Sequence, residues 1–592
     1  MSNVDYDVVI VGAGISGALI ANDLASKGVS VLILEAGETT AVRQTFIDDF
    51  YAANIKTPGA PYLPTKDAPR PDVPLNAKWK DPRAFDTDPR YYFVQTGPDA
   101  FGSTYERLTG GTTQHWLGTS LRLFPEDFKT KTTFGFADDW PIDYDELEPW
   151  YTKAEYEIGV AGDVAVDEAV GINHTKPYPM KPIPASWSDQ VIKQKLDGKV
   201  IDGKTISVDL TPQARNTEFY DKRPICMGNT SCVPVCPIQA KYDATVHLKK
   251  AVNQKVPAII QSKSVVHRIE FKAGSNDVAG ITYKSWDGTE HTVTATRYVM
   301  AAHAIETSKI LLMSPWKTDS SGNEVYAANS SGLVGKRLMD HICLVAWGLS
   351  KDAPLHPYRG PLSTSGIGAF RHGDFRSESA AFRIELGNEG WNWPTGAPDT
   401  MVDTFVNNDG IFGGALKTKL HDSGINQFRI ALELEATPLN SSYTVPSTKY
   451  KDKFGIPRPE LHYRINDPEV KNGNYTVKGY KNAAALYPQL FEEAGIKNFT
   501  SVDTTPGTPG LFAYEGVQYQ FRGAGHIIGT YTMGSSPDSS VVDKYQRSWD
   551  HSNLFLVGSG TFPTTATANP TLTIAALALW TAETIGKDLQ SA

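Results

Sequence analysis

The first 35 residues constrain the fold most strongly, because a glycine motif stands there between two apolar runs. The run over 6–11 is followed by Gly12, Gly14 and Gly17, then by a longer apolar stretch, and a second run covers 29–34. This order predicts a strand, a tight turn, a helix and a second strand. The phosphates of a nucleotide would lie at the N-terminus of that helix, where free N–H groups favour anions.

Each glycine has a defined part in such a motif. Gly12 permits the tight turn, Gly14 lets the backbone approach a pyrophosphate, and Gly17 lets helix and strand pack closely. Glu35 ends the second run, 18 residues past Gly17. An acidic side chain there can accept hydrogen bonds from ribose hydroxyls and disfavours a 2′-phosphate. The segment therefore predicts a Rossmann-like dinucleotide-binding domain, without separating FAD from NAD.

Composition narrows the class of protein. The chain has 592 residues, 40% of them hydrophobic, which suggests two to four domains, or fewer if domains are discontinuous. A net charge of −9 without a long basic run makes nucleic acid an unexpected partner. No apolar run reaches the roughly 18–20 residues that span a bilayer. Asp5 and Asp7 occupy the place of a signal peptide, so we expect no export signal.

Three of the four cysteines, Cys226, Cys232 and Cys236, fall within eleven residues. The loop between them is rich in glycine, asparagine, serine and proline, which can turn several sulfurs toward one point. Three interpretations remain open from the spacing: structural thiols or a disulfide, a zinc site, and an iron–sulfur cluster. Three thiolates ending in Cys-Pro suit a [3Fe–4S] cluster best, and zinc would require a fourth ligand that is not close in sequence.

The carboxy-terminal region carries a second candidate site. His526 stands among glycines, and either a core histidine or a general base is compatible with that setting. A buried strand follows and ends in glycines that include Gly560. Asn569, Pro570 and Thr571 then precede an apolar helix, with Asn569 expected as N-cap and Pro570 as the first helical residue.

Taken together, these segments resemble the glucose–methanol–choline (GMC) oxidoreductases. The resemblance rests on the nucleotide motif with Glu35, on Gly110-Gly111-Thr112-Thr113-Gln114-His115-Trp116, on 301–312, on Met339-Asp340-His341 and on the carboxy-terminal block. It implies FAD as cofactor. It also implies an α/β (α+β overall) GMC fold, in which a Rossmann-like FAD-binding domain is interleaved with a substrate domain built on an antiparallel sheet.

The resemblance also implies residues and domain boundaries. The residues expected at the FAD are Gly12, Gly14, Gly17, Glu35, Gly110, Gly111, Thr112, His115, Trp116, Gly560, Asn569, Pro570 and Thr571. The expected segments are 1–125, 220–340 and 520–592 for the FAD domain, with the iron–sulfur loop at 226–237, and 126–219 and 341–519 for the substrate domain. Aromatic side chains in the second of these, including Trp391 and Trp393, are candidates for stacking on a sugar.

Within the family, the chain resembles the catalytic large subunits of bacterial FAD-dependent sugar dehydrogenases. The discriminating pieces are the three-cysteine stretch, 139–142 and 569–577. In such proteins the three cysteines bind a [3Fe–4S] cluster, which implies that role for the cysteines here. Relatives of this type pair with a small subunit that carries the export signal, and often with a c-type cytochrome acceptor. Periplasmic location by co-export and cytoplasmic location both remain open.

The resemblance assigns the chemistry to two residues. His526 is expected as the general base and Asn569 as its partner, in the oxidation of a CH–OH group of a sugar or glycoside by hydride transfer to the flavin N5. Pyranose 2-oxidases share a Thr-His-Trp signature whose histidine carries the flavin covalently. His115 is the matching residue, but Gln114 replaces the threonine, so the link stays open. An oxygen-using oxidase of that type, producing hydrogen peroxide, is the alternative function.

Overall fold

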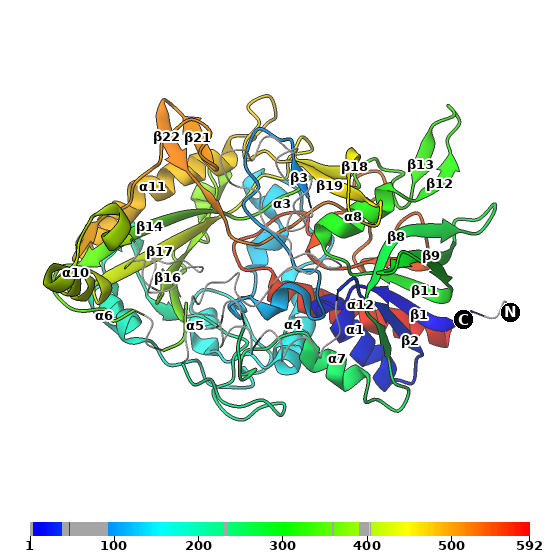
Figure 1. Cartoon of the computed structure of the whole chain (residues 1–592), viewed down its shortest axis with the longest axis horizontal. Coiled ribbons are helices and arrows are strands. Elements are labelled where there is room, and N and C mark those ends of the chain that lie inside the picture. Colours follow the sequence, from blue (N-terminus) through cyan, green and yellow to red (C-terminus); the bar gives the residue numbers. More distant parts are fainter. Residues whose placement is uncertain are drawn as a thin grey trace.

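The computed structural model describes residues 4–37, 47, 93–228, 232, 235–357, 360–389, 402 and 404–591, and Trp391 and Trp393 lie outside them. Two large sheets stand toward opposite ends of the long axis of the molecule (Figure 1). One is parallel and contains the amino-terminal motif, and the other is antiparallel. Their separation leaves room between them for the site described below.

The parallel sheet confirms the expected Rossmann-like unit. Its strands, in spatial order, are β24 (Leu554–Leu556), β11 (Ala295–Met300), β1 (Tyr6–Val11), β2 (Val31–Leu34) and β7 (Ile259–Gln261). Helix α1 (Ile15–Ser26) follows β1 after the glycine turn. The turn requires glycine, because Gly12 has φ +103° and a Cβ there would lie 2.5 Å from the Ala301 carbonyl oxygen. A Cβ on Gly17 would lie 2.1 Å from the Gly12 carbonyl oxygen, so this glycine allows close helix–strand packing.

The antiparallel sheet has one apolar and one charged face. Its strands are β20 (Ile496–Asn498), β14 (Ile342–Ser350), β17 (Gln427–Leu434), β16 (Phe382–Gly387), β15 (Ser365–Ile367) and β6 (Asp209–Leu210), and β23 (Arg522–Gly523) pairs with β14. Leu432 faces Ile384 on the side that packs under helix α11 (Tyr475–Glu493). One residue further along, Glu433 faces Arg383 on the other side. This alternation is what the pleat of a strand requires when only one face is covered.

Smaller elements surround the two sheets. Further helices are α3 (Thr130–Phe134), α4 (Tyr144–Ile158), α5 (Val164–Glu168), α6 (Trp187–Leu196), α7 (Thr245–Ala251), α8 (Ala304–Leu312), α10 (Gly413–Gly424) and α12 (Thr571–Gln590). Further strands include β8 (Ser264–Phe271), β9 (Val278–Ser285) and β10 (Glu290–Val293) in one sheet, and β3 (Val94–Gln95), β18 (Tyr443–Lys451) and β19 (Pro457–His462) in another. Hairpins are formed by β12 (Pro315–Thr318) with β13 (Glu324–Tyr326), β21 (Leu511–Tyr514) with β22 (Val517–Gln520), and β4 (Val200–Ile201) with β5 (Lys204–Thr205).

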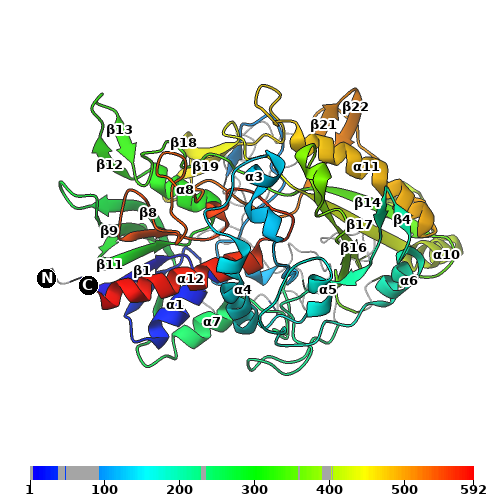
Figure 2. The same ribbon diagram turned by 180° about the vertical axis from the view of Figure 1, so that it is seen from behind.

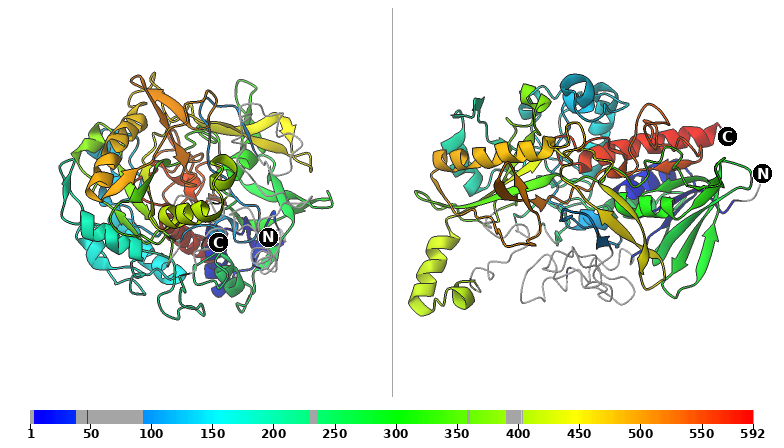
Figure 3. Two further views of the ribbon diagram at one scale, coloured as in Figure 1. Left: turned by 60° about the vertical axis from the view of Figure 1, so that its left-hand side comes forward. Right: turned by 90° about the horizontal axis from the view of Figure 1, so that it is seen from above.

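Helix α12 ties the two ends of the chain together. It packs against both α1 and α4, and Figure 2 shows it crossing in front of them. Helices α11 and α12 lie on the same side of the molecule, one over each large sheet (Figure 3). Among the described residues, no helix has the length and apolar character needed to cross a membrane.

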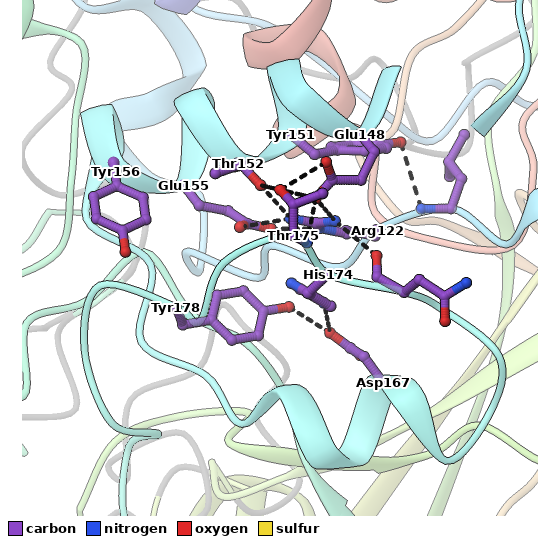
Figure 4. Close-up of polar contacts among 12 residues, drawn as sticks. Arg122, Glu148, Tyr151, Thr152, Glu155, Tyr156, Asp167, His174, Thr175 and Tyr178 are labelled. Carbon is purple, nitrogen blue, oxygen red and sulfur yellow. Dashed lines mark hydrogen bonds and ion pairs between the residues drawn. The ribbon is translucent and has the colours of Figure 1, made fainter. Parts of the chain in front are cut away.

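A buried ion network holds helix α4 to the segment before it (Figure 4). The Arg122 guanidinium donates to both carboxylate oxygens of Glu155, at 2.7 and 2.8 Å, and to Glu148 at 3.1 Å. It also donates to the hydroxyls of Tyr144 and Thr152 and to the Asn173 carbonyl oxygen. Buried charges persist only when they are paired and hydrogen-bonded, so this network fixes the position of α4 under α12.

The expected domain boundaries remain a proposal. The strands of the parallel sheet fall in the three segments expected for the FAD domain. Strand β23, however, lies past residue 519 and still pairs with β14 of the antiparallel sheet. The segment 520–592 therefore contributes to both sheets.

Candidate active site

A cavity of about 960 Å³ lies between the two large sheets. Residues just beyond the carboxyl ends of β1, β11 and β24 line one side, which is where open α/β sheets bind ligands. Glu385 and Glu433 of the antiparallel sheet line the other side. The cavity is therefore walled by the nucleotide motif on one side and by the charged sheet face on the other.

The part of the cavity next to the glycine motif has room for a dinucleotide. A Cβ on Gly14 would meet no atom within 4 Å, and a Cβ on Gly111 would meet only the Gly14 Cα, at 3.5 Å. Both glycines line the cavity, so side chains there would fill the space in front of the first turn of α1. A pyrophosphate fits that space, next to the free N–H groups of the helix.

Glu35 lies at the same end, with its carboxylate already engaged by the backbone. Its oxygens accept from Ala13 N and Gly37 N, each at 2.8 Å. Burial raises the pKa of Glu35, and the two N–H donors oppose that rise. Each oxygen keeps a further lone pair, and the residue lines the cavity where the sequence places a ribose.

Most of the residues expected at the FAD border the cavity. These are Gly12, Gly14, Glu35, Gly111, Thr112, His115, Trp116, Asn569, Pro570 and Thr571. Gly17, Gly110 and Gly560 do not. A Cβ on Gly560 would lie 2.0 Å from the Tyr531 ring, so this glycine serves packing, while Gly558 and Ser559 line the cavity beside it.

A hydrogen bond from Trp116 holds the segment that carries His115. The Trp116 indole N–H donates to the Tyr242 carbonyl oxygen at 2.7 Å. His115 keeps 28% of its side chain exposed, and its Nδ1 lies 3.5 Å from a Glu106 carboxylate oxygen. Its imidazole therefore stays at the surface of the cavity, paired with an acid.

His526, His341 and Asn569 form a chain of hydrogen bonds at the other end of the cavity. His526 Nε2 lies 3.0 Å from Asn569 Nδ2, and His526 Nδ1 lies 3.1 Å from His341 Nδ1. His341 Nε2 lies 3.0 Å from the Ala566 carbonyl oxygen. Asn569 Oδ1 is buried without a hydrogen-bond partner among the described residues.

This chain fixes the tautomer of His526. A carbonyl oxygen only accepts, so His341 Nε2 must carry a proton. Burial lowers the pKa of His341 to about 4, so the ring is neutral and its Nδ1 is an acceptor. His526 must then donate through Nδ1, which leaves Nε2 unprotonated and able to accept from Asn569 Nδ2. Burial also lowers the pKa of His526 well below its usual value, with neighbouring His341 and Arg383 acting in the same direction.

Asp340, next to His341, anchors the backbone of His526. Its Oδ1 accepts from His526 N at 2.8 Å, and its Oδ2 accepts from the Ser103 hydroxyl. Burial raises the pKa of Asp340 to about 7. Adjacent residues thus hold His526 twice, through its backbone and through its ring. Sequence reasoning did not assign roles to these two residues, although Met339-Asp340-His341 was part of the resemblance.

The approach to Asn569 is a threonine-rich segment, 564–567, anchored by side chains from distant parts of the chain. Its hydrogen bonds, with the donor first, are Trp140 Nε1–Thr564 Oγ1 (3.0 Å), Ala436 N–Thr565 Oγ1 (3.0 Å), His341 Nε2–Ala566 O (3.0 Å), Arg371 Nε–Thr567 O (2.9 Å) and Thr567 Oγ1–Asp127 Oδ2 (2.9 Å). Ala566 adopts φ +55°, a conformation that costs energy for a residue with a Cβ. The surrounding contacts stabilise it and so place the next turn.

The expected role of Asn569 as N-cap is wrong. Helix α12 begins at Thr571 with Pro570 in the capping position, and no side chain caps it. The Asn569 amide instead faces His526, as described above. The first turn of α12 still borders the cavity, because Pro570 and Thr571 both line it.

Lys241 links Cys232 to the segment that carries His115. None of the four cysteines, all of which the structure describes, forms a disulfide, and Cys232 and Cys236 are buried. Lys241 Nζ donates to the carbonyl oxygens of Cys232 (2.8 Å), Gln114 (2.9 Å) and Trp116. Burial lowers the pKa of Lys241 to about 8. One buried cation thus joins the cysteine loop to the segment around His115.

A second buried cation, Arg215, lies near Cys226. Burial raises the pKa of Cys226, the neighbouring Arg215 lowers it, and the proximity of Cys232 and Cys236 raises it further. Arg215 Nη2 is buried without a hydrogen-bond partner among the described residues. Within the part of the chain that the structure describes, no group of three or more Cys, His, Asp or Glu side chains is arranged to hold a metal ion.

The comparisons with known proteins agree with this geometry. Two GMC oxidoreductase family models match residues 110–343 and 441–578, and a model of the NAD(P)-binding Rossmann-like domain matches residues 10–53. The chain therefore belongs to the GMC oxidoreductases, FAD-dependent enzymes that act on CH–OH groups.

Several relatives match along the whole chain. The fructose dehydrogenase large subunit of Gluconobacter japonicus is 34% identical over 594 residues, covering 100% of both chains. The gluconate 2-dehydrogenase flavoprotein of Pantoea cypripedii is 22% identical, covering 98% of this chain and 93% of its own. Among solved structures, pyridoxine 4-oxidase from Mesorbium loti shares the fold, with a TM-score of 0.61 and 17% identity over 98% of this chain and 99% of its own.

The space at Gly14 generates a prediction about FAD. We expect Gly14→Val to fold but to lose most bound FAD, because the added methyl groups would occupy the pyrophosphate space. Gly414→Val is the matched control, since Gly414 also has open space around it but lies in α10, away from the cavity. The ratio of flavin to protein absorbance measures the loss. Equal FAD content in the two variants would contradict the assignment.

Proposed function

We propose that this protein is an FAD-dependent sugar or glycoside dehydrogenase that oxidises a CH–OH group to a carbonyl. The observation that carries the proposal is the unprotonated Nε2 of His526. It accepts from Asn569 Nδ2, its tautomer follows from His341, and His526 borders the cavity that also has a dinucleotide cradle. The full-length similarity to the fructose dehydrogenase large subunit supports a sugar as substrate. Bound FAD would supply the acceptor for the hydride that leaves the carbinol carbon.

The residues of the chain manage the proton. His526 Nε2 accepts the proton of the substrate hydroxyl while the carbinol C–H bond breaks, so one proton and one hydride leave the alcohol and a carbonyl forms. A substrate hydroxyl competes with Asn569 Nδ2 for the same lone pair, and the displaced N–H donates to the hydroxyl oxygen. Asn569 can orient the substrate in this way because an amide does not take up the proton.

The finer proposal concerns electron release. Cys226, Cys232 and Cys236 would hold a [3Fe–4S] cluster, which supplies one-electron transfer when bound. The chemistry of the donors supports the proposal, because Arg215 lies near Cys226 and Lys241 lies near Cys232 and Cys236, and both cations favour thiolates and an anionic cluster. The three sulfurs are not gathered around one point in the described residues, so cluster binding would have to bring them together. A small partner subunit and a c-type cytochrome acceptor are part of this proposal. The oxygen-using alternative predicts stoichiometric peroxide in air and no requirement for the cysteines.

The role of His526 is tested by His526→Ala. We expect the variant to retain FAD and to reduce it with sugar roughly 10²–10⁴-fold more slowly, the usual worth of general-base catalysis. Anaerobic stopped-flow bleaching of the flavin measures this step alone. A bleaching rate close to that of the unchanged protein would show that His526 is not the base.

The role of His341 is tested by a pair of variants. His341→Leu removes the acceptor for His526 Nδ1–H, so we expect a fall in flavin reduction of about 100-fold or more, as when a catalytic histidine loses its tautomer. His341→Asn keeps an acceptor oxygen near the same place and should recover much of the rate, with KM unchanged in both variants. Equal rates in the Leu and Asn variants would contradict tautomer control.

The lowered pKa of His526 also predicts the pH dependence of the unchanged protein. Nε2 stays unprotonated as pH falls, so the plateau of the flavin-reduction rate should extend below pH 6.5.

The iron–sulfur proposal has a readout that does not depend on turnover. Protein purified anaerobically should contain about three iron atoms per chain. Cys232→Ser should lose most of this iron and its acid-labile sulfide, yet keep FAD and bleaching by sugar. Cys343→Ser is the matched control, because Cys343 is a buried thiol on β14 outside the loop. Iron-free unchanged protein, or equal iron in both variants, would exclude the cluster.

A further inference from the structure

The side of the cavity opposite the nucleotide motif is formed by the charged face of the antiparallel sheet. We use this term for Arg383, Glu385, Arg429 and Glu433, which lie on β16 and β17 and are at most 5% exposed. Glu385 and Glu433 border the cavity directly. Four buried charges on a substrate-sized cavity require an explanation, because burial without full pairing is costly.

Glu385 is well satisfied by its neighbours. It lies 3.4 Å from both Arg383 and Arg429, and its Oε1 accepts from the Ser363 hydroxyl at 3.0 Å. Arg383 is engaged at both ends of its fork, since its Nη2 donates to the Thr211 hydroxyl at 2.9 Å. Arg383 is therefore held by Glu385 and Thr211, while Arg429 pairs with Glu385 and, more closely, with Glu389.

Glu433 is the exception on this face. Among the described residues its carboxylate has an ion pair with Arg383 at 3.7 Å and accepts no hydrogen bond. Burial and the neighbouring Glu385 raise the pKa of Glu433 to about 7, against the opposing effect of Arg383 and Arg429. A carboxyl group that is 5% exposed, lines a cavity and lacks donors is suited to accept hydrogen bonds from a ligand.

We propose that Glu433, with Glu385 beside it, binds hydroxyl groups of a neutral polyhydroxylated substrate on the side of the cavity opposite the flavin cradle. The inference rests on the proposed function and adds a substrate-recognition residue to it. Carboxylate oxygens accept hydrogen bonds from the O–H groups of a sugar, and a ligand that donates to Glu433 favours its ionised form. A substrate with one hydroxyl uses that group at His526 and has none left for this face.

The register of the sheet gives the subsite its rigidity. Glu433 faces Arg383 across β16 and β17 and Cys343 across β14 and β17, so its strand is paired on both sides. The opposite face of the same strands is packed in the apolar core under α11. A recognition group on a strand fixed in this way is more precisely placed than one on a loop.

Glu433→Gln is the test, because it keeps the size of the side chain and removes its charge. D-Fructose and D-glucose are compared first, and monodeoxy derivatives of the faster one are then used in a cycle with the variant. We expect the variant to lower kcat/KM for the parent sugar roughly 10- to 100-fold, the worth of a hydrogen bond to a charged group. With the unchanged protein, one deoxy derivative should have a kcat/KM lower than that of the parent sugar by the same factor. With the variant, removing that hydroxyl should lower kcat/KM little further.

Two controls separate recognition from structural damage. Glu378→Gln makes the same change at an exposed position and should leave all rates unchanged. The FAD content of Glu433→Gln should equal that of the unchanged protein. The Tm of Glu433→Gln at pH 7 should equal or exceed that of the unchanged protein. The pKa of Glu433 is raised in the folded protein, so its ionisation disfavours folding once the pH exceeds the usual pKa of a glutamate.

The outcomes distinguish the inference from the proposed function. If no sugar bleaches the flavin, the proposed function fails. If sugars bleach it but every deoxy derivative loses the same factor in the variant as in the unchanged protein, the dehydrogenase stands and Glu433 does not bind a hydroxyl. If Glu433→Gln loses FAD or unfolds, a purely structural role replaces the recognition role. Loss of the extra factor at one hydroxyl alone supports the subsite.

Discussion

The chemistry of this protein depends on a chain of hydrogen bonds that starts at a single backbone carbonyl. Ala566 O can only accept, and this fact propagates through His341 to the lone pair of His526 Nε2. The carbonyl points correctly because its residue adopts φ +55°, and that conformation persists because side-chain contacts on both sides hold the segment around it. The orientation of a proton acceptor is thus determined by the tertiary packing of residues far from it in sequence.

Several independent parts of the fold meet at this segment. Arg371 donates to Thr567 O and also, at 3.0 Å, to the carbonyl oxygen of Arg122, whose side chain is the centre of the buried network on α4. The same arginine therefore links the wall of the cavity to the packing of α4 under α12. Two hydrogen bonds of Arg371 thus connect Arg122, which anchors α4, to the segment just before Asn569.

The features that depend on residues close together in the sequence could be predicted from it. The turn at Gly12, the close packing at Gly17 and the parallel strands around them follow from local pattern and sterics, and the structure confirms them. The predicted capping by Asn569 was wrong because a local preference lost to a long-range partner, His526. The relay through His341 has no signature in the sequence, since it depends on which ring nitrogen faces a carbonyl 225 residues away. Glu433 was also missed, because an isolated acidic residue in a strand carries no signal until its partners are known. The hydrogen bond between His341 and His526 and the subsite at Glu433 thus become visible only once the sheets are assembled.

The strand order of the parallel sheet has a consequence for synthesis. The sheet places β24, from residues 554–556, beside β11, and α12 packs on α1 near the beginning of the chain. The cradle for FAD is therefore closed by segments that leave the ribosome long after the glycine motif. A nascent chain can form the first strand, turn and helix early, but the residues that border the FAD site are not all present until α12 has been made. Stable loading of FAD must therefore follow the synthesis of α12, and a truncation that removes this helix is expected to release an apoprotein.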